Sequence, residues 1–382
     1  MKILSFRLTI LAMACACGGV QAQTTVSTAP VGFNSVSTLG NSDTRFSVPL
    51  HRPAVYAGLV QSVSGTGGNI VTAQGTPGWT TGPDQFVYAQ GTQSNTYYIE
   101  FTSGNKVGMT YTVADNSTNT LTLDLNGDAL DGSNGTGAVA AGDSFSVIPY
   151  WTLGTLFPSG QGVTAAANVT GSGSLTQILV ISGNAEGINL APNFTYYYYG
   201  GNGTFAAGWR QIGGGFTTLF DDTVVSSDQT VVIRQNGVSA TSVLTATGTV
   251  PTNQRSYVIG TIQANAQQDN WIGIDVPIAL TLAQSNLATS GAFTGASNVT
   301  GTGGDELLVF DDTVAGYNKA PNSIYYYYGG NGTFAAGWRK VGGGFTTLFD
   351  STAVFQPGSG YIIRKQATSV PTSAVWSLPL PY

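Results

Sequence analysis

The sequence predicts an all-β protein that consists of two homologous β-sandwich-like repeats and a small N-terminal β-barrel. Thr, Val, Ile and Tyr dominate between Gly, Asn and Pro residues, as in strands separated by turns. The stretch 196–221 recurs at 325–350 with only two differences, and a separate region carries seven short strand-like runs. Aromatic residues make up 11% of the chain, which argues against a disordered protein.

The segment 1–22 has the order of a cleavable export signal. A basic start precedes the apolar run Leu8 to Ala16, and small residues follow as far as Ala22, after which we expect cleavage. Cys15 and Cys17 near the end of the apolar run leave a lipoprotein anchor as the alternative. Because both cysteines belong to this segment, we expect neither disulfides nor thiolate chemistry in the mature chain.

The charge of the mature chain limits its partners. Without Lys2 and Arg7 of the signal, 11 of the 13 basic residues remain against 19 acidic residues, which gives a net charge of −8. Nucleic acid is not expected as a partner, since phosphate binding needs clustered Lys and Arg. No other apolar run reaches the roughly 20 residues of a membrane helix, so no transmembrane segment is expected in the mature chain. The predicted location is extracellular or at the outer cell surface, with the periplasm as the alternative.

The barrel is predicted from short runs that are rich in β-branched and aromatic residues and are separated by Gly, Asn and Asp turns. The runs are AGLVQSVSG, GNIVTAQG, QFVYAQG, NTYYIEFTSG, KVGMTYTVAD, NTLTLDLNG and GDSFSVIP. The predicted domain boundaries are 1–22 for the signal, 23–149 for the barrel domain, 150–265 for the first repeat and 266–382 for the second repeat.

The repeats are recognised from a duplicated unit at Tyr196 to Asp221 and Tyr325 to Asp350. Both copies begin with YYYYGGNGTFAAGWR, and weaker likeness in the flanking segments extends each repeat on both sides. The segment Asp43 to Pro53 loosely echoes Asp269 to Thr281. This echo leads to the hypothesis that the barrel interrupts the first repeat.

The tyrosine quartets supply rings to both faces of a strand, because successive side chains point to opposite sides. One pair is expected to fill the sandwich core, and the other to lie against the neighbouring repeat, another subunit or a ligand such as a sugar ring. Thr204 to Ile212 is expected to return as a partner strand, with an Arg stacked on a ring. A hydrophobic hairpin within each repeat is the simplest interpretation. The candidate ligand or interface residues are Tyr197, Tyr199, Trp209, Arg210, Tyr326, Tyr328, Trp338 and Arg339.

The segment LDLNGDALDG contains a possible calcium loop. Asp124, Asn126 and Asp128 stand at its first, third and fifth positions, and Asp131 is nearby. However, Ala129 replaces the turn glycine and no Glu follows at the twelfth position. An Asn-Gly turn between strands is therefore favoured, and otherwise no cofactor is expected.

No catalytic constellation is found, so the chain is predicted not to be an enzyme. His51 is the only histidine, and no G-x-S-x-G elbow occurs. One His without Cys cannot form a zinc or copper site. A glycosidase needs only two carboxylates, but Glu306 is matched by Gln177 in the other repeat, so no duplicated acid is visible.

Four segments together resemble a family of exported bacterial proteins of unknown function. They are VPLHRPAVYAG, GDSFSVIPYWTLGTLF, the YYYY…GWR…GGGF unit and AQQDNWIGIDVP. The resemblance covers nearly the whole mature chain and implies export and a shared architecture, but no active site.

The predicted function is that of an exported cell-envelope or extracellular structural or adhesive protein that associates through aromatic faces. A carbohydrate-binding module is the alternative, and a glycosidase-type enzyme is the third candidate. The expected partners are further copies of the chain or a surface polysaccharide.

Overall fold

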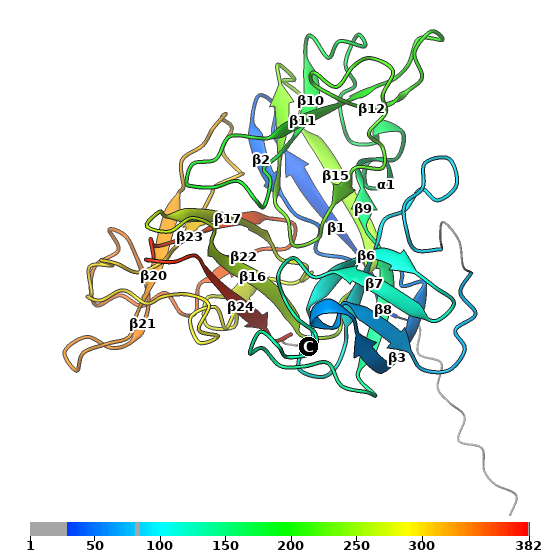
Figure 1. Cartoon of the computed structure of the whole chain (residues 1–382). Coiled ribbons are helices and arrows are strands. Elements are labelled where there is room, and N and C mark those ends of the chain that lie inside the picture. The colour runs from blue at the N-terminus through cyan, green and yellow to red at the C-terminus, as the bar shows by residue number, and fades with distance from the viewer. Residues whose placement is uncertain (1–28, 81–84, 381) are drawn as a thin grey trace, which may run out of the picture.

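The computed structural model describes residues 29–80, 85–380 and 382, so the predicted signal, 1–22, lies outside the described residues. The described chain is nearly all β and contains a closed six-stranded barrel, two five-stranded sheets and four two-stranded ribbons (Figure 1). This arrangement confirms the predicted all-β fold class. Among the described residues, no helix has the length and the hydropathy that crossing a membrane requires.

The barrel occupies the region where the short strand-like runs were predicted. Its strands, in order around the barrel, are β3 (Tyr56–Ser64), β4 (Ile70–Ala73), β7 (Thr120–Asp124), β6 (Thr110–Asn116), β5 (Tyr97–Phe101) and β8 (Ser144–Pro149), with the 3-10 turn η1 (Thr66–Gly68). Six of the seven predicted runs form strands. The seventh, Gln85 to Gly91, does not, because the Asn116 side chain accepts the Phe86 N–H in place of a ladder partner while the Phe86 ring enters the core.

Strand β5 is buried along its whole length, unlike the other barrel strands. Tyr97, Ile99 and Phe101 fill the barrel core, as alternation predicts. The opposite face, with Tyr98 and Glu100, is also buried, because it packs against the rest of the molecule. β5 therefore contacts the other two units, and the barrel loop with Val107 and Gly108 accepts hydrogen bonds from Ser256.

The first unit contains a five-stranded sheet with the order β12 (Gly208–Gln211), β11 (Phe194–Tyr199), β10 (Leu175–Val180), β14 (Val231–Asn236) and β2 (Asp43–Phe46). Its other elements are the ribbons β1 (Val31–Thr38) with β15 (Ser242–Thr249) and β9 (Trp151–Thr152) with β13 (Val224–Val225), the helix α1 (Leu153–Leu156) and the 3-10 turn η2 (Pro158–Gly160). Phe46, Trp209 and Leu244 belong to the core between the sheet and the β1–β15 ribbon.

The second unit has a five-stranded sheet with the same pattern of connections. Its order is β21 (Gly337–Lys340), β20 (Ser323–Tyr328), β19 (Glu306–Val309), β23 (Gly360–Lys365) and β17 (Gln268–Gly273). Its ribbons are β16 (Arg255–Thr261) with β24 (Thr372–Leu378) and β18 (Leu280–Thr281) with β22 (Ala353–Phe355). Strands and residues that occupy the same place in the two units are called matched below. The homology of the two units stays a prediction.

Strand pairing places the barrel inside the first unit. β1 pairs with β15 and β2 pairs with β14, whereas the intervening barrel closes on itself between Tyr56 and Pro149. The predicted boundary at residue 265 also differs from the pairing, because it puts β16 in the first repeat while β16 pairs with β24. Two reciprocal bridges, Phe46 with Ser359 and Gln229 with Ile272, then join the units to each other.

Candidate functional site

The tyrosine quartets lie in the interior. Tyr196 packs in the core of the first unit, and Tyr198 is partly buried against it. Tyr197 and Tyr199 form a small cluster on the opposite face with Ala166. The segment around Ala166 covers this face: Ala166 bridges Tyr199, and the Tyr197 hydroxyl donates to the carbonyl of Val169 at 2.6 Å.

The second quartet is covered in the same way. Ala296 bridges Tyr328, and the Tyr326 hydroxyl donates to the carbonyl of Val299 at 2.7 Å. The two tryptophans among the candidate ligand or interface residues, Trp209 and Trp338, are also buried. Rings were expected on both faces, and they are present, but loops of the same unit cover the second face. The candidate rings of that face, Tyr197, Tyr199, Tyr326 and Tyr328, are therefore buried and are not open to a ligand or to another chain.

Arg210 and Arg339 organise the loops around these rings. Arg210 is 1% exposed and donates through Nε to the carbonyl of Phe216 at 3.0 Å, through Nη1 to that of Gly208 at 3.0 Å and through Nη2 to that of Ala206 at 2.6 Å. Its guanidinium carbon lies 5.1 Å from the centre of the Tyr199 ring. This cation is therefore a buried clamp that fixes two loops.

The matched Arg339 repeats the same geometry. It donates to the carbonyls of Phe345, Gly337 and Ala335 at 3.0, 3.1 and 2.6 Å, and it lies 5.1 Å from the Tyr328 ring. The predicted stacking of Arg on a tyrosine is present in both units. Its role is to hold the loops, because the guanidinium is buried among carbonyl oxygens.

The loops that the clamps hold expose apolar side chains. In the first unit Phe216 is 51% exposed, and in the second the matched Phe345 is 52% exposed. We define the first tip as Ile212, Phe216 and Leu219, and the second tip as Val341, Phe345 and Leu348, all of which are exposed. Each short loop thus exposes three apolar side chains that are close in the sequence, and we treat them as one candidate patch.

The residues that directly follow each tip shield the edge of its sheet. β12 and β21 are terminal strands, and an open edge would pair with other chains. In the first unit the Trp209 N–H donates to Asp221 at 3.2 Å, and the Trp209 carbonyl accepts the Phe220 N–H at 2.9 Å. Asp350 and Phe349 cap Trp338 in the same way. A partner must therefore contact the tip through side chains.

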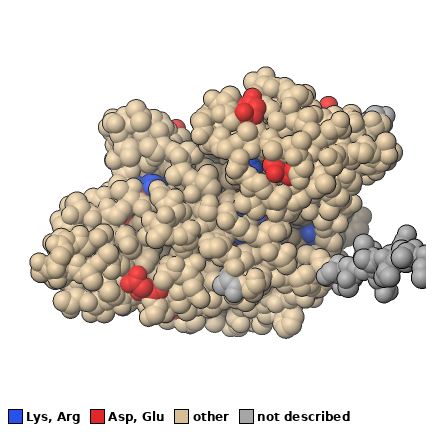
Figure 2. Space-filling view, turned by 90° about the horizontal axis from the view of Figure 1, so that it is seen from below, with Lys and Arg blue, Asp and Glu red and all other residues tan. Residues whose placement is uncertain are grey.

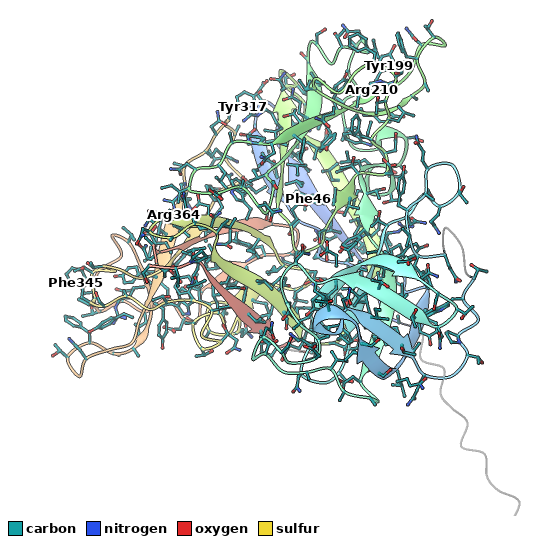
Figure 3. All side chains as sticks on the ribbon, viewed as in Figure 1. Phe46, Tyr199, Arg210, Tyr317, Phe345 and Arg364 are labelled. Atoms are coloured by element: carbon teal, nitrogen blue, oxygen red, sulfur yellow. The ribbon has the colours of Figure 1, made fainter. Side chains whose placement is uncertain are left out.

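The two tips lie at opposite ends of the molecule. In Figure 3, Arg210 and Tyr199 of the first unit are at the top right, and Phe345 of the second tip is at the lower left. The face shown in Figure 2 carries few charged residues, so we expect only weak electrostatic attraction of a charged partner to this face. The molecule therefore presents two matched apolar patches in widely separated positions.

The candidate calcium loop forms a turn, which is the interpretation that the sequence favoured. Asn126 adopts a positive φ of 48°, and its N–H donates to Asp124 at 3.1 Å. Asp128 instead accepts hydrogen bonds from the Lys106 ammonium at 2.7 and 2.8 Å, so its carboxylate is paired with a lysine and not with a metal ion. Asp131 is exposed and accepts the N–H of Ser133. No cluster of three or more metal-ligating side chains is present among the described residues.

A buried charge cluster joins the barrel to both units, and the sequence did not predict it. His51 Nε2 lies 2.6 Å from Asp275, and its Nδ1 lies 3.3 Å from Glu100. Arg255 contacts Glu100 at 2.5 Å and Asp275 at 2.6 Å. The Tyr257 hydroxyl also donates to Asp275. We call His51, Glu100, Arg255 and Asp275 the junction cluster.

The electrostatics of the junction cluster favour the ionised forms of Asp275 and Arg255. Burial raises the pKa of Asp275, but the Arg255 guanidinium and the hydrogen bond from His51 outweigh it and hold this pKa well below its usual range. Burial lowers the pKa of Arg255, but the carboxylates of Asp275 and Glu100 outweigh this effect and raise the pKa above its usual value. All four side chains are buried, and they come from the barrel and from both units, so the cluster links the three modules and the histidine is not exposed.

The fold and these sites define an all-β protein of three modules, with two clamped apolar tips and a buried charged junction. A scan against protein-family models, a search of curated proteins and a search of solved structures each returned no match for this chain. The tips were missed although GGGF and TTLF place apolar residues in a glycine-rich loop, which is a surface signal. The junction residues come from distant segments, and no local pattern unites them.

Proposed function

We propose that the chain is an exported structural or adhesive protein of the cell envelope or the extracellular space, and that it associates with further copies of itself through its two tips. The observation that carries this proposal is the matched pair of exposed apolar patches, each held by a buried arginine. Association through the tips replaces the predicted association through the tyrosine faces, because those faces are covered.

Two tips on each molecule favour an assembly that can grow by adding one molecule after another. A tip that contacts a tip uses the same apolar surface on both chains, and each chain still has a second tip free. Burying a Phe, Leu or Ile side chain contributes about 1.5–3 kcal/mol, but association costs about 4–15 kcal/mol in lost freedom. Each contact is therefore expected to be weak, and assembly is expected to depend steeply on concentration.

Variants of the tips test this proposal. Wild type is expected to form filaments or larger oligomers as its concentration rises, in sedimentation velocity and electron microscopy. Phe216→Ser or Phe345→Ser leaves one tip and is expected to stop assembly at the dimer, and the double variant is expected to remain monomeric. Val243→Ser with Val258→Ser is the control, since both valines are exposed on strands away from the tips.

Two results would contradict association through the tips. One is a wild-type chain that stays monomeric up to millimolar concentration. The other is a double tip variant that assembles like wild type. Retention of wild type on a polysaccharide, lost in the double tip variant, would instead favour the carbohydrate-binding alternative with the tips as its surface.

Export is the second part of the proposal, and the basic-apolar-small order of the segment 1–22 supports it. Fractionation of a culture that produces the full chain, followed by N-terminal mass determination, tests it. A chain that starts after Ala22 in the medium or at the cell surface is expected. An uncleaved chain in the cytoplasm would contradict export, and a lipid on Cys15 or Cys17 would identify the anchored alternative.

A further inference from the structure

A pocket of about 410 Å³ lies between the outer faces of the two five-stranded sheets. Its walls are apolar: Leu179 and Val232 come from the first sheet, and Leu308 and Ile362 come from matched positions of the second. Ligand pockets typically have volumes of about 300–1,000 Å³, apolar walls and a few fixed polar groups, and they often lie between domains. The pocket is separate from both tips.

One polar corner of the pocket is an Asp-Arg fork in the first unit. Arg234 donates through Nε and Nη2 to Asp43 at 2.7 and 2.8 Å, and through Nη2 to Asn318 at 2.8 Å. The Asn318 N–H donates to Asp43 at 2.7 Å, so a loop of the second unit completes the fork of the first. Nη1 of Arg234 donates to none of the described residues.

The opposite corner repeats this fork with the units exchanged. Arg364 donates through Nε and Nη2 to Asp269 at 2.7 and 3.0 Å, and through Nη2 to Asn189 at 3.1 Å. The Asn189 N–H donates to Asp269 at 2.7 Å. Nη1 of Arg364 also donates to none of the described residues, so each guanidinium keeps one terminal nitrogen for another acceptor.

Two buried donors in the pocket lining have no acceptor among the described residues. They are Nε of Arg45 and Nε1 of Trp271, which stand at matched positions of β2 and β17. An unsatisfied buried donor costs about 1–3 kcal/mol. Arg45 is 5% exposed, and its guanidinium stacks 3.4 Å from the centre of the Phe310 ring, which provides a flat apolar surface in the lining.

The pocket concentrates positive charge in an acidic protein. Four of the 11 basic residues beyond the predicted signal line it, namely Arg45, Arg234, Lys319 and Arg364. Asp43 and Asp269 are the only acidic residues in the lining. Asp312 contacts Arg45 and Lys319, and the carboxylates of Glu306 and Asp311 also interact with Arg364 and Lys319. The lining itself therefore carries four cations and two carboxylates, and further carboxylates lie beside the cations outside the lining.

We propose that this pocket binds a small molecule that has a flat apolar body and one anionic group. The apolar walls and the Phe310 and Trp271 rings contact the body, and the free Nη1 group of Arg234 or of Arg364 donates to an oxygen of the anionic group. A neutral molecule of the same shape would leave those donors unsatisfied and would bind more weakly.

Two fluorescent probes with the same rings test the ligand class. 8-Anilinonaphthalene-1-sulfonate is anionic, and N-phenyl-1-naphthylamine is its neutral counterpart. Wild type is expected to bind the anionic probe at least tenfold more tightly than the neutral probe. Binding is expected to weaken with rising salt, because the charge interaction is partly screened.

The internal match of the two units supplies a control variant. Ala320 is exposed and lines the pocket, whereas the matched Ala191 is exposed and does not line it. Ala320→Trp is expected to reduce binding of the anionic probe at least tenfold, and Ala191→Trp is expected to leave it unchanged. Thermal unfolding of both variants checks that they fold.

Three outcomes with wild type and Ala320→Trp would overturn the proposal. They are equal affinity for the two probes, unchanged binding in folded Ala320→Trp, and no binding by wild type. Loss of binding in the Phe216→Ser and Phe345→Ser double variant would place the probe on the tips and would also overturn it. Failure of tip assembly leaves the pocket unaffected, so the two proposals are tested separately.

Discussion

Replacement of Arg255 by Met should destabilise the whole molecule. Arg255 is 3% exposed and contacts Glu100 of the barrel and Asp275 of the second unit at 2.5 and 2.6 Å. Removing one partner of a buried ion pair typically costs about 3–5 kcal/mol, because an uncompensated charge remains. Here one cation serves two buried carboxylates and only His51 remains beside them, so we expect a loss near the upper end of that range.

Urea unfolding at pH 7, followed by tryptophan fluorescence, measures this loss of unfolding free energy. Lys340→Met is the control, since Lys340 forms no ion pair among the described residues, and a change within about 0.5 kcal/mol is expected for it. Glu100→Gln in the Arg255→Met background removes one stranded charge and should recover part of the loss. A double-mutant cycle then gives the coupling energy between Glu100 and Arg255.

A small effect would refute this reasoning. If Arg255→Met costs less than about 1 kcal/mol, the carboxylates are solvated or protonated and the junction cluster does not pin the modules. Strict additivity of Glu100→Gln and Arg255→Met would likewise show that the two charges do not interact. Separate unfolding transitions of barrel and units in the wild type would show that the modules are not coupled.

Three further predictions concern the tips, the turn and the interruption of the first unit. Arg210→Met removes three hydrogen bonds to carbonyl oxygens, so hydrogen exchange and proteolysis should rise in the first tip only, with a stability loss of about 2 kcal/mol or more. Burial raises the pKa of Asp128, but the hydrogen bonds from Lys106 and Tyr111 lower it to about 2. The ionised carboxylate therefore contributes its full stabilisation of the fold above about pH 4, and this contribution is lost as the pH falls towards 2. Urea midpoints measured across this range should depend less on pH in Asp128→Asn than in wild type. A fragment spanning Tyr150 to Gln263 should show no cooperative unfolding by circular dichroism. It lacks β2, which pairs with β14 and contributes Phe46 to the core. A fragment that folds independently would contradict this prediction.

The sequence was most informative where periodicity and turn residues coincide. Six barrel strands and the pairing of the tyrosine strand with its GWR strand follow from these patterns. The paired segment is shorter than predicted, because only Gly208–Gln211 forms the strand and the preceding residues are held as a loop by Arg210. A buried arginine with carbonyl partners leaves no local pattern, so the loop resembled a continuing strand.

The covered face of the tyrosines could not be predicted for a related reason. Alternation correctly indicated rings on both sides of the strand. The cover over Tyr197 and Tyr199 is a segment rich in Gly, Ser and Thr around Ala166 and Val169, whose composition is typical of solvated loops. A sequence reveals which rings need burial, but tertiary contacts decide what buries them.

The pairing of β3 with β8 has a consequence for engineering. The chain leaves the first unit and returns to it through two hydrogen-bonded neighbours, with Tyr56 opposite Val147. Paired strands are about 5 Å apart, so the surrounding scaffold has only to bridge that short gap. A foreign domain whose termini are equally close could be grafted there as an exchangeable cassette, with the host framework left in register on both sides.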